Sequence, residues 1–262
     1  MAERADRHAL YEEAVQDAPT EVEFVSGTFQ SVRGRPARLL REDFCGTANV
    51  ACEWVRAHRE NRAVGVDLSE EVLAWGREHH LSRLSPAQAD RVELLCADVL
   101  DARSGPVDVN LAMNFSYWTF HTRDTLRNYF QRVRANLVDD GLFIMDVFGG
   151  HDAYKEMREH RDCDGFTYIW DQARYDPVTG RYTCHIHFRF PDKSRINEAF
   201  TYEWRLWSLP ELREVLEEAG FSDSTVYWQG TDEETGEGNG EFDPVEHGEA
   251  DPAWIAYIVA EK

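Results

Sequence analysis

Three carboxylates and one amide side chain follow successive apolar segments in the first half of the chain. Glu42 closes the first segment, Asp67 closes the second, Asp98 follows the third and Asn114 follows the fourth. If these segments are neighbouring parallel strands, the four side chains lie at one edge of a sheet, where carboxylates can accept hydrogen bonds from ribose hydroxyls and amino groups. Their order therefore predicts one binding site for a polar ligand at the carboxyl ends of the strands.

The turn that follows Glu42 is built mainly from small residues. Gly46 and Ala48 leave the turn nearly free of side chains, and helical spacing begins at Ala51 and Trp54. Such a turn allows a flat polar ligand to approach the backbone amides at the positive end of a helix. An ordinary strand-to-helix turn is the alternative interpretation of this segment, and the order of the polar residues favours the functional one.

This order of features resembles the class I S-adenosylmethionine-dependent methyltransferases across residues 37–150. In that family an acid followed by three alternating glycines usually stands where this chain has Glu42-Asp43-Phe44-Cys45-Gly46-Thr47-Ala48. Only the middle glycine, Gly46, is present here, and Phe44 and Ala48 replace the other two.

The resemblance implies S-adenosyl-L-methionine as the cofactor and S-adenosyl-L-homocysteine as its product. It implies that Glu42 binds the methionine ammonium group, directly or through water, and that Asp67 accepts both ribose hydroxyls. Asp98 would accept from the adenine amino group, and Asn114 would lie near the reaction centre. The expected cofactor contacts are Glu42, Phe44, Cys45, Gly46, Thr47, Ala48, Asp67, Leu68, Asp98, Val99 and Asn114.

Strands and helices alternate in the central part of the chain, which predicts an α/β fold with helices on both faces of a parallel sheet. The resemblance implies a Rossmann-like, doubly wound sheet of seven strands in the order 3-2-1-4-5-7-6, with strand 7 antiparallel. Residues 166–175, 181–190 and 197–207 predict three strands of an antiparallel sheet inserted before the last helix. The acidic, glycine-rich stretch from Gly230 to Asp251 predicts a surface excursion, with a loop beside the acceptor pocket as the alternative.

These elements divide the chain into four expected parts. The two leading helices would fold over the cofactor as a lid, as the resemblance implies, and the inserted sheet would cover the acceptor site. The parts are a helical lid at 1–34, the cofactor-binding core at 35–150, the inserted subdomain at 151–207 and a C-terminal helix with strands at 208–262 that completes the core.

Methyl transfer from a sulfonium is a direct displacement, so alignment and exclusion of water matter more than a dedicated base. His121 is the best placed candidate base, with Tyr117 one turn earlier, because a histidine suits deprotonation near neutral pH. Tyr11 is expected near the transferred methyl group by the resemblance alone. A local hydrogen bond of His121 and simple packing of Tyr11 are the structural alternatives.

Three further features have both a chemical and a structural interpretation. Arg41 lies within an expected buried strand, where an ion pair with Asp43 is favoured over contact with the cofactor carboxylate. His185 and His187 share one strand face without a recognisable third ligand, so no metal site is expected. An aromatic cluster, most of it expected in the core, could form a cage for an amine or a flat ring: Phe115, Tyr117, Trp118, Phe120, Tyr202, Trp204 and Trp207.

The composition narrows the class of partner. The chain has 49 Asp and Glu against 28 Lys and Arg, a formal charge of −21, which repels nucleic acids and anionic membranes and favours a small-molecule acceptor. Only three bases are lysines, which fits either a salty cytoplasm or a GC-rich genome that favours arginine. We expect a cytoplasmic monomer or homodimer with reduced cysteines, no membrane span and no secretory signal, because the five cysteines are scattered and no long apolar run occurs.

The sequence therefore predicts an enzyme, a methyltransferase that uses S-adenosylmethionine to methylate nitrogen or oxygen of a small molecule. An NAD(P)-dependent oxidoreductase is one alternative; it would share Asp67 but should show Gly-x-Gly-x-x-Gly at the first turn. A non-catalytic S-adenosylmethionine-binding protein is the other, and it would keep Glu42, Asp67 and Asp98.

Overall fold

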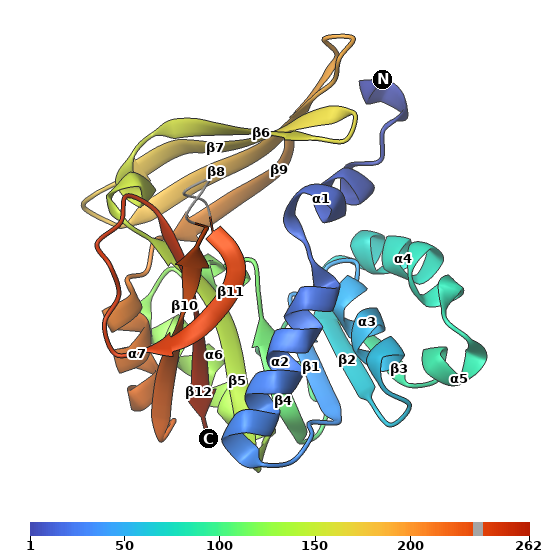
Figure 1. The fold of residues 1–262 in the computed structure, drawn as a ribbon, viewed down its shortest axis with the longest axis vertical. Coiled ribbons are helices and arrows are strands. Elements are labelled where there is room, and N and C mark those ends of the chain that lie inside the picture. Colours follow the sequence, from blue (N-terminus) through green and yellow to red (C-terminus); the bar gives the residue numbers. More distant parts are fainter. Residues whose placement is uncertain (233–237) are drawn as a thin grey trace.

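The computed structural model describes residues 1–232 and 238–262 and contains one large and one small sheet (Figure 1). The predicted α/β class and the order of seven strands are confirmed. The first five strands of the large sheet are parallel, and the last strand of the chain pairs antiparallel with the fifth. In spatial order the large sheet consists of β3 (Val92–Cys96), β2 (Arg62–Asp67), β1 (Leu39–Asp43), β4 (Val107–Ala112), β5 (Leu137–Gly149), β12 (Trp254–Glu261), β10 (Asp223–Thr231) and β11 (Gly238–Val245).

The eighth strand, β11, corrects the expectation of seven strands and of a surface excursion between Gly230 and Asp251. It pairs antiparallel with β10, and its Phe242 ring stacks on Tyr257 of β12 at a centroid distance of 4.0 Å. The sequence of this strand is acidic and glycine-rich and lacks apolar alternation, so backbone pairing and one aromatic contact form the strand without a visible pattern. Residues 233–237 of the predicted excursion lie outside the described residues.

The inserted sheet has four strands where three were expected: β6 (Met157–Cys163), β7 (Phe166–Asp176), β8 (Arg181–Arg189) and β9 (Arg195–Arg205). The missed strand, β6, is an edge strand with mostly exposed and charged side chains, so its sequence shows no buried face. Alternate residues of β8, Tyr182, Cys184, Ile186 and Phe188, are all buried, as in a strand with one face toward the core. The turn from β7 to β8 closes with the Gly180 amide donating to the Asp176 carbonyl at 2.8 Å.

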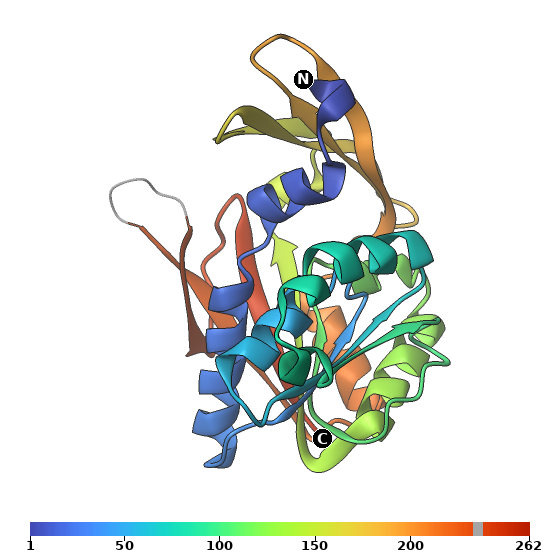
Figure 2. The same cartoon turned by 90° about the vertical axis from the view of Figure 1, so that its right-hand side faces the viewer.

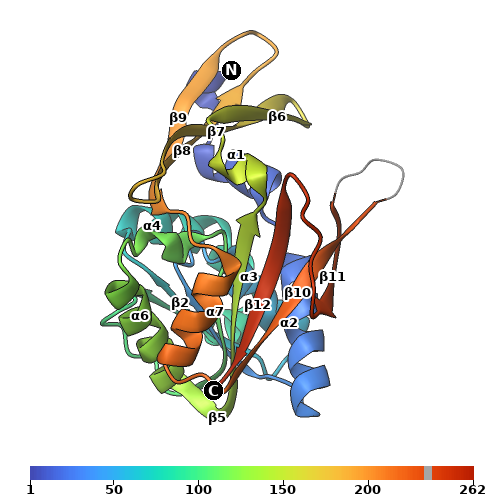
Figure 3. The same cartoon turned by 90° about the vertical axis from the view of Figure 1, so that its left-hand side faces the viewer.

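Helices cover both faces of the large sheet (Figure 3). α2 (Ala18–Arg33), α3 (Asn49–Ala57) and α4 (Glu70–His79) pack apolar side chains into one core, and α6 (Arg123–Asn136) and α7 (Leu209–Glu218) pack into the other. A capping box begins α7: the Ser208 hydroxyl accepts from the Glu211 amide at 3.4 Å, and the Glu211 carboxylate accepts from the Ser208 amide. The remaining helices are α1 (Arg7–Val15), α5 (Pro86–Ala89), η1 (Ala2–Arg4), η2 (Leu81–Arg83), η3 (Ser116–Thr119) and η4 (His151–Tyr154).

Helix α1 lies between the small sheet and the edge of the large sheet where the parallel strands end (Figure 2). Its apolar side chains join a third core, in which Leu10, Tyr11 and Ala14 meet Ile186 and Phe188 of β8. The Met1 amino group also forms an ion pair with Asp192 at 2.7 Å, in the turn between β8 and β9. The N-terminal segment therefore joins the small sheet to the rest of the molecule. No described helix is long and apolar enough to cross a membrane.

Candidate functional site

The turn after β1 has the backbone conformation that glycines would permit. Phe44, Gly46 and Ala48 stand at the three positions where the methyltransferase family that this chain resembles usually has glycines. Their φ angles are +59°, +53° and +59°. Residues with a Cβ adopt this left-handed region at a cost of about 1 kcal/mol. The turn conformation is therefore kept although two of the three glycines are replaced.

Hydrogen bonds fix this turn between β1, β2 and α1. The Gly46 amide donates to Asp67 Oδ2 at 2.9 Å, and the Cys45 amide donates to the Val66 carbonyl at 3.0 Å. The Thr47 hydroxyl donates to Glu12 of α1. The Cys45 thiol is buried, and burial raises its pKa well above the usual range, so it is a packing group and not a nucleophile.

The structure brings the three strand-end acids to one edge of the large sheet. Glu42 of β1 is buried, and its Oε2 accepts from the Ala51 amide of α3 at 3.0 Å. Asp67, at the end of β2, accepts from the Ser69 amide at 2.8 Å, and Asp98, just after β3, accepts from the Leu100 amide at 2.9 Å.

An apolar residue follows each of the two acids Asp67 and Asp98 in the sequence. The Leu68 side chain is 70% exposed, whereas Val99 is buried. An exposed leucine beside these acids offers an open apolar surface for a flat ring.

Asn114 lies at the end of β4 in a strained segment. Asn114 and Phe115 both have a φ of +56°, and their amides donate to the two carboxylate oxygens of Asp146 at 2.7 and 2.9 Å. Asp146 belongs to β5 and is buried; burial raises its pKa to about 7, although the amides of Phe115 and Asn114 oppose the shift. This pair of bonds holds the Asn114 side chain at the border of the main cavity.

Buried carboxylates without a basic partner lie beside this edge. Burial raises the pKa of Glu42 well above its usual range, and no ion pair to Glu42 or Asp146 occurs among residues 1–232 and 238–262. An uncompensated buried carboxylate is costly, so a ligand with a cationic group would be stabilised here. The residues present therefore fit the amino-acid end of S-adenosylmethionine.

The predicted ion pair of Arg41 is confirmed. Its Nε donates to Asp43 Oδ1 at 2.7 Å, and the two side chains are 1% and 0% exposed. Arg41 also donates to the carbonyls of Val99 and Ala102, and the Tyr129 hydroxyl donates to the second oxygen of Asp43. The Arg41 guanidinium therefore makes its hydrogen bonds and its ion pair inside the core.

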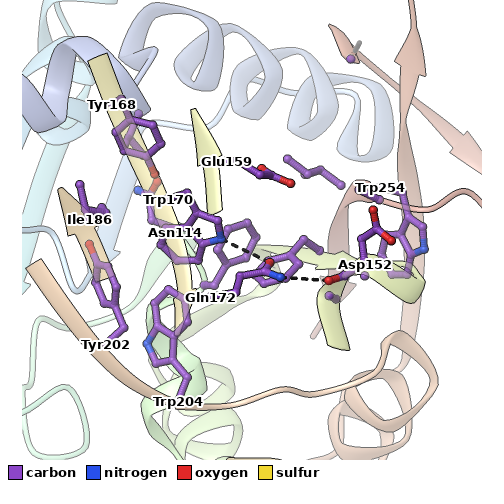
Figure 4. Close-up of a pocket in the computed structure, with 18 of the residues that line it drawn as sticks. Asn114, Asp152, Glu159, Tyr168, Trp170, Gln172, Ile186, Tyr202, Trp204 and Trp254 are labelled. Atoms are coloured by element: carbon purple, nitrogen blue, oxygen red, sulfur yellow. Dashed lines mark hydrogen bonds between the residues drawn. The ribbon is translucent and has the colours of Figure 1, made fainter. Parts of the chain in front are cut away.

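A cavity of about 470 Å³ lies between the small sheet, α1 and the ends of β4, β5 and β12. Asn114, at the end of β4, borders the cavity, so the predicted cofactor edge and the cavity share this residue (Figure 4). Its acidic lining residues are Asp152 and Glu159, and none of its lining residues in the described part of the chain is a lysine or an arginine. Its aromatic lining residues are Tyr11, Phe115, Phe148, Tyr168, Trp170, Tyr202, Trp204 and Trp254.

The three predicted catalytic residues lie in different places. Tyr11 lines the cavity and is hydrogen-bonded to Tyr202, and burial raises its pKa well above the usual range. Tyr117 does not line it; the side chain is fully buried and its hydroxyl donates to the Asp146 carbonyl at 2.7 Å. His121 also lies outside the cavity, with Nε2 at 2.7 Å from the Glu203 carbonyl and Nδ1 against Arg181. Only Tyr11 is therefore placed where it could meet an acceptor.

The residues of the predicted aromatic cluster are also divided between the cavity and the core. Phe115, Tyr202 and Trp204 line the cavity, whereas Trp118 and Trp207 are fully buried in the core. Sequence reasoning missed Trp170 and Trp254, which come from β7 and β12 and reach the cavity only through the fold. Period-two alternation in β7 could have indicated Trp170, but nothing in the sequence indicates which face of that strand meets the cavity.

The histidines considered for a metal have other partners. His187 lies 3.1 Å from the Asp171 carboxylate, and His185 lies 2.9 Å from the Thr201 hydroxyl. Within the described residues no group of three or more His, Cys, Asp or Glu side chains is arranged to hold a metal ion.

Known proteins show the same fold around this site. Residues 44–141 match the family model described as a methyltransferase domain. An S-adenosylmethionine-dependent methyltransferase from Clostridium acetobutylicum is 18% identical, with a TM-score of 0.71 over 97% of this chain and 96% of that chain. The amino pentose methyltransferase CalS10 from Micromonospora echinaspora is 14% identical, with a TM-score of 0.67 over 97% and 95%.

A third solved structure, the sugar N-methyltransferase KedS8 from a Streptoalloteichus species, is 16% identical, with a TM-score of 0.64 over 98% of this chain and 93% of that chain. Comparison with curated proteins gives no significant match. The conformation of the turn after β1, the strand order of the large sheet and the segment that matches the family model all indicate the same kind of fold. The chain therefore matches a methyltransferase domain over residues 44–141 and has the fold of solved S-adenosylmethionine-dependent methyltransferases.

Proposed function

We propose that this protein transfers a methyl group from S-adenosylmethionine to an amine nitrogen of a small molecule held in the aromatic cavity. The observation that carries the proposal is the lining of that cavity, which combines aromatic rings and carboxylates with no basic side chain in the described part of the chain. Aromatic faces and carboxylates attract a cationic or amino group. An anionic acceptor would be repelled by the same lining.

Glu159 is the carboxylate best suited to receive the amine. Asp152 is already paired with Lys155, which lowers its pKa, whereas the Glu159 side chain has no hydrogen bond or ion pair with any described residue. Glu159 comes from β6 and lines the same cavity as Trp254 and Tyr202 (Figure 4). We assign to Glu159 the recognition of the ammonium form and the acceptance of the proton that leaves the nitrogen.

The cofactor would occupy the edge formed by the strand-end acids. The proposed contacts are those of the sequence prediction: Glu42 for the ammonium group, Asp67 for the ribose hydroxyls, Asp98 for the adenine amino group, with Leu68 and Val99 beside the ring. Asn114, which borders both this edge and the cavity, would lie nearest to the reacting atoms.

Bound S-adenosylmethionine supplies an electrophilic methyl group, which the acceptor nitrogen attacks as the carbon–sulfur bond breaks and S-adenosylhomocysteine is released. The chain contributes alignment, because aromatic side chains line the cavity and Tyr11 and Val15 of α1 form part of its wall. Glu159 takes one proton from the bound ammonium group, which frees the nitrogen lone pair for attack; the product leaves as the methylated ammonium ion, and Glu159 returns its proton to solvent.

Two solved structures with this fold support nitrogen over oxygen, because one is an amino pentose methyltransferase and another a sugar N-methyltransferase. An amino sugar would place its hydroxyl groups against the polar groups of the lining, such as Gln172 and Tyr202, and its ring face against Trp170. We therefore propose an amino sugar or a comparable hydroxylated amine as the acceptor.

The test has two stages. Calorimetric titration with S-adenosylmethionine, S-adenosylhomocysteine and NAD should give binding of the first two and none of the third. Turnover is then measured with paired acceptors that differ only in an amine or a hydroxyl group, for wild type, Glu159→Gln and Glu156→Gln, whose side chain does not line the cavity. Turnover of amines that falls in Glu159→Gln alone supports the proposal; turnover of the hydroxyl acceptors only, or NAD binding, contradicts it.

A further inference from the structure

Glu21 is a buried acid in the helix that precedes the first strand. It belongs to α2, is 9% exposed, and its Oε2 is buried without a hydrogen-bond partner in the described part of the chain. Its neighbours on the same helix, Val22 and Val25, are core residues. A carboxylate placed among apolar side chains without a partner is unfavourable, so its position requires an explanation.

The groups that act electrostatically on Glu21, or on which Glu21 acts, are acidic or uncharged. Asp17 lies on the preceding turn of the chain, Glu42 on β1, Asp146 on β5 and Tyr257 on β12. Burial first, and then the carboxylates of Asp146 and Asp17, raises the pKa of Glu21 to about 8. Glu21 in turn contributes, after burial, to the raised pKa of Glu42.

These electrostatic neighbours place Glu21 near the cofactor edge and not in a separate site. Glu42 is the acid that closes β1, and Asp146 receives the amides of Asn114 and Phe115 at the border of the cavity. Three carboxyl groups from α2, β1 and β5 therefore converge on one buried region, and none of them has a basic partner among the described residues. A single cation placed there would stabilise the ionised form of all three carboxyl groups.

We propose that Glu21 is a second carboxylate for the α-ammonium group of the cofactor, offered by α2 opposite Glu42. The proposal rests on the proposed function, because it assumes that S-adenosylmethionine binds at this edge. It adds a binding residue from outside the matched segment 44–141. It also makes cofactor binding a proton-linked event.

The linkage has a definite sign. Near pH 7 Glu21 is mostly protonated in the free protein, and a cation beside it favours the ionised form, so binding must release a proton to solvent. Affinity should accordingly rise as pH increases from 6 toward 8. S-adenosylhomocysteine carries the same ammonium group but no sulfonium, so it should release a similar amount.

The experiment is calorimetric titration of the full-length protein at pH 7 in two buffers of different ionisation enthalpy, with each of the two ligands. We expect wild type to release about half a proton or more per ligand. Glu21→Gln should release less by about that amount and bind at least threefold more weakly. Glu23→Gln, an exposed acid on the same helix, should match wild type.

Several outcomes would overturn the inference. Equal proton release by wild type and Glu21→Gln would show that Glu21 does not meet the ligand, while binding itself would leave the proposed function standing. Release with S-adenosylmethionine alone would assign the charge to the sulfonium and contradict the ammonium contact. If wild type binds neither ligand, the proposed function falls together with the inference. Binding without any proton release by wild type would also overturn the inference, so a poorly folded variant does not remove the test.

Discussion

The Thr47 hydroxyl, in the turn after β1, donates a hydrogen bond to the Glu12 carboxylate of α1, 35 residues earlier in the chain. The same Glu12 oxygen lies 2.7 Å from His80 Nε2, and His80 follows α4. One side chain of the N-terminal segment thus joins the turn that we assign to the cofactor and the helix after β2. Any movement of α1 away from the sheet has to break both contacts.

This relationship predicts that α1 acts as a lid. Deletion of residues 1–16 should abolish turnover and raise the Kd for S-adenosylmethionine, because the deletion removes Tyr11 from the cavity wall and Glu12 from the turn. The core sheet should remain folded, as circular dichroism and thermal melting would show. Full activity in the truncated protein would mean that the segment only packs.

Single substitutions separate the effect of the Glu12 hydrogen bonds from the effect of α1 packing. Glu12→Gln removes the charge but keeps the shape, and should weaken cofactor binding by roughly threefold to tenfold if one charge-assisted hydrogen bond is lost. Glu13→Gln, the exposed neighbour on the same helix, is the matched control and should bind like wild type.

Much of the fold could be predicted because the signals were local. Apolar segments ending in an acid gave β1 and β2, and the Ser208–Glu211 capping box marked the start of α7. The missed strands, β6 and β11, are exposed or polar, so pairing with a neighbour and not a buried face decides their conformation.

Only the part of the site that we assign to the cofactor could be predicted from the sequence. Asp67 and Asp98 follow strands, so sheet topology alone brings them together. Trp170, Glu159 and Trp254 come from three separate strands, and their meeting depends on how the small sheet packs over the large one. Glu21 carried no signal because one acid in an amphipathic helix is ordinarily solvated; only its burial reveals it.

The left-handed turn gives a prediction for stability. Ala48 is buried with a φ of +59°, so Ala48→Gly should be neutral or raise the free energy of unfolding by up to about 1 kcal/mol, because glycine removes the steric cost. Ala51→Gly, inside α3 and equally buried, should instead lower it by about 1 kcal/mol or more. Chemical denaturation of both variants measures the difference; equal losses would contradict the assignment of strain to the turn.

The buried acids predict a pH dependence of stability. Burial raises the pKa of Glu21 to about 8 and that of Asp146 to about 7, whereas both are much lower in an unfolded chain. Their contribution is therefore fully present below about pH 4 and is lost as the pH rises through 7 and 8. The Tm without ligand should fall by roughly 5 °C or more between pH 6 and pH 9.

Two comparisons sharpen this pH test. Glu21→Gln should flatten the fall in Tm, and saturating S-adenosylhomocysteine should do the same by stabilising the ionised forms. A Tm that rises with pH over this interval would show that these carboxyl groups are ionised in the free protein.

The acidic composition gives a prediction with two possible origins. If the charge of −21 and the scarcity of lysine are a salt adaptation, screening of the surface carboxylates should raise Tm by several degrees between 0.1 M and 2 M potassium chloride. Activity should persist at 2 M. A Tm that stays flat or falls would favour genome composition as the cause.

The central claim is that the acid at the end of β2 holds the cofactor. Asp67→Ala removes a charged acceptor of two hydroxyl hydrogen bonds, each contributing about 1.5–3 kcal/mol. Because Asp67 also accepts from the Gly46 and Ser69 amides, melting of the variant must first show an intact fold. Calorimetric titration of wild type and Asp67→Ala with S-adenosylmethionine is the most direct measurement: a loss of affinity of at least tenfold is predicted, and equal affinities would contradict the account.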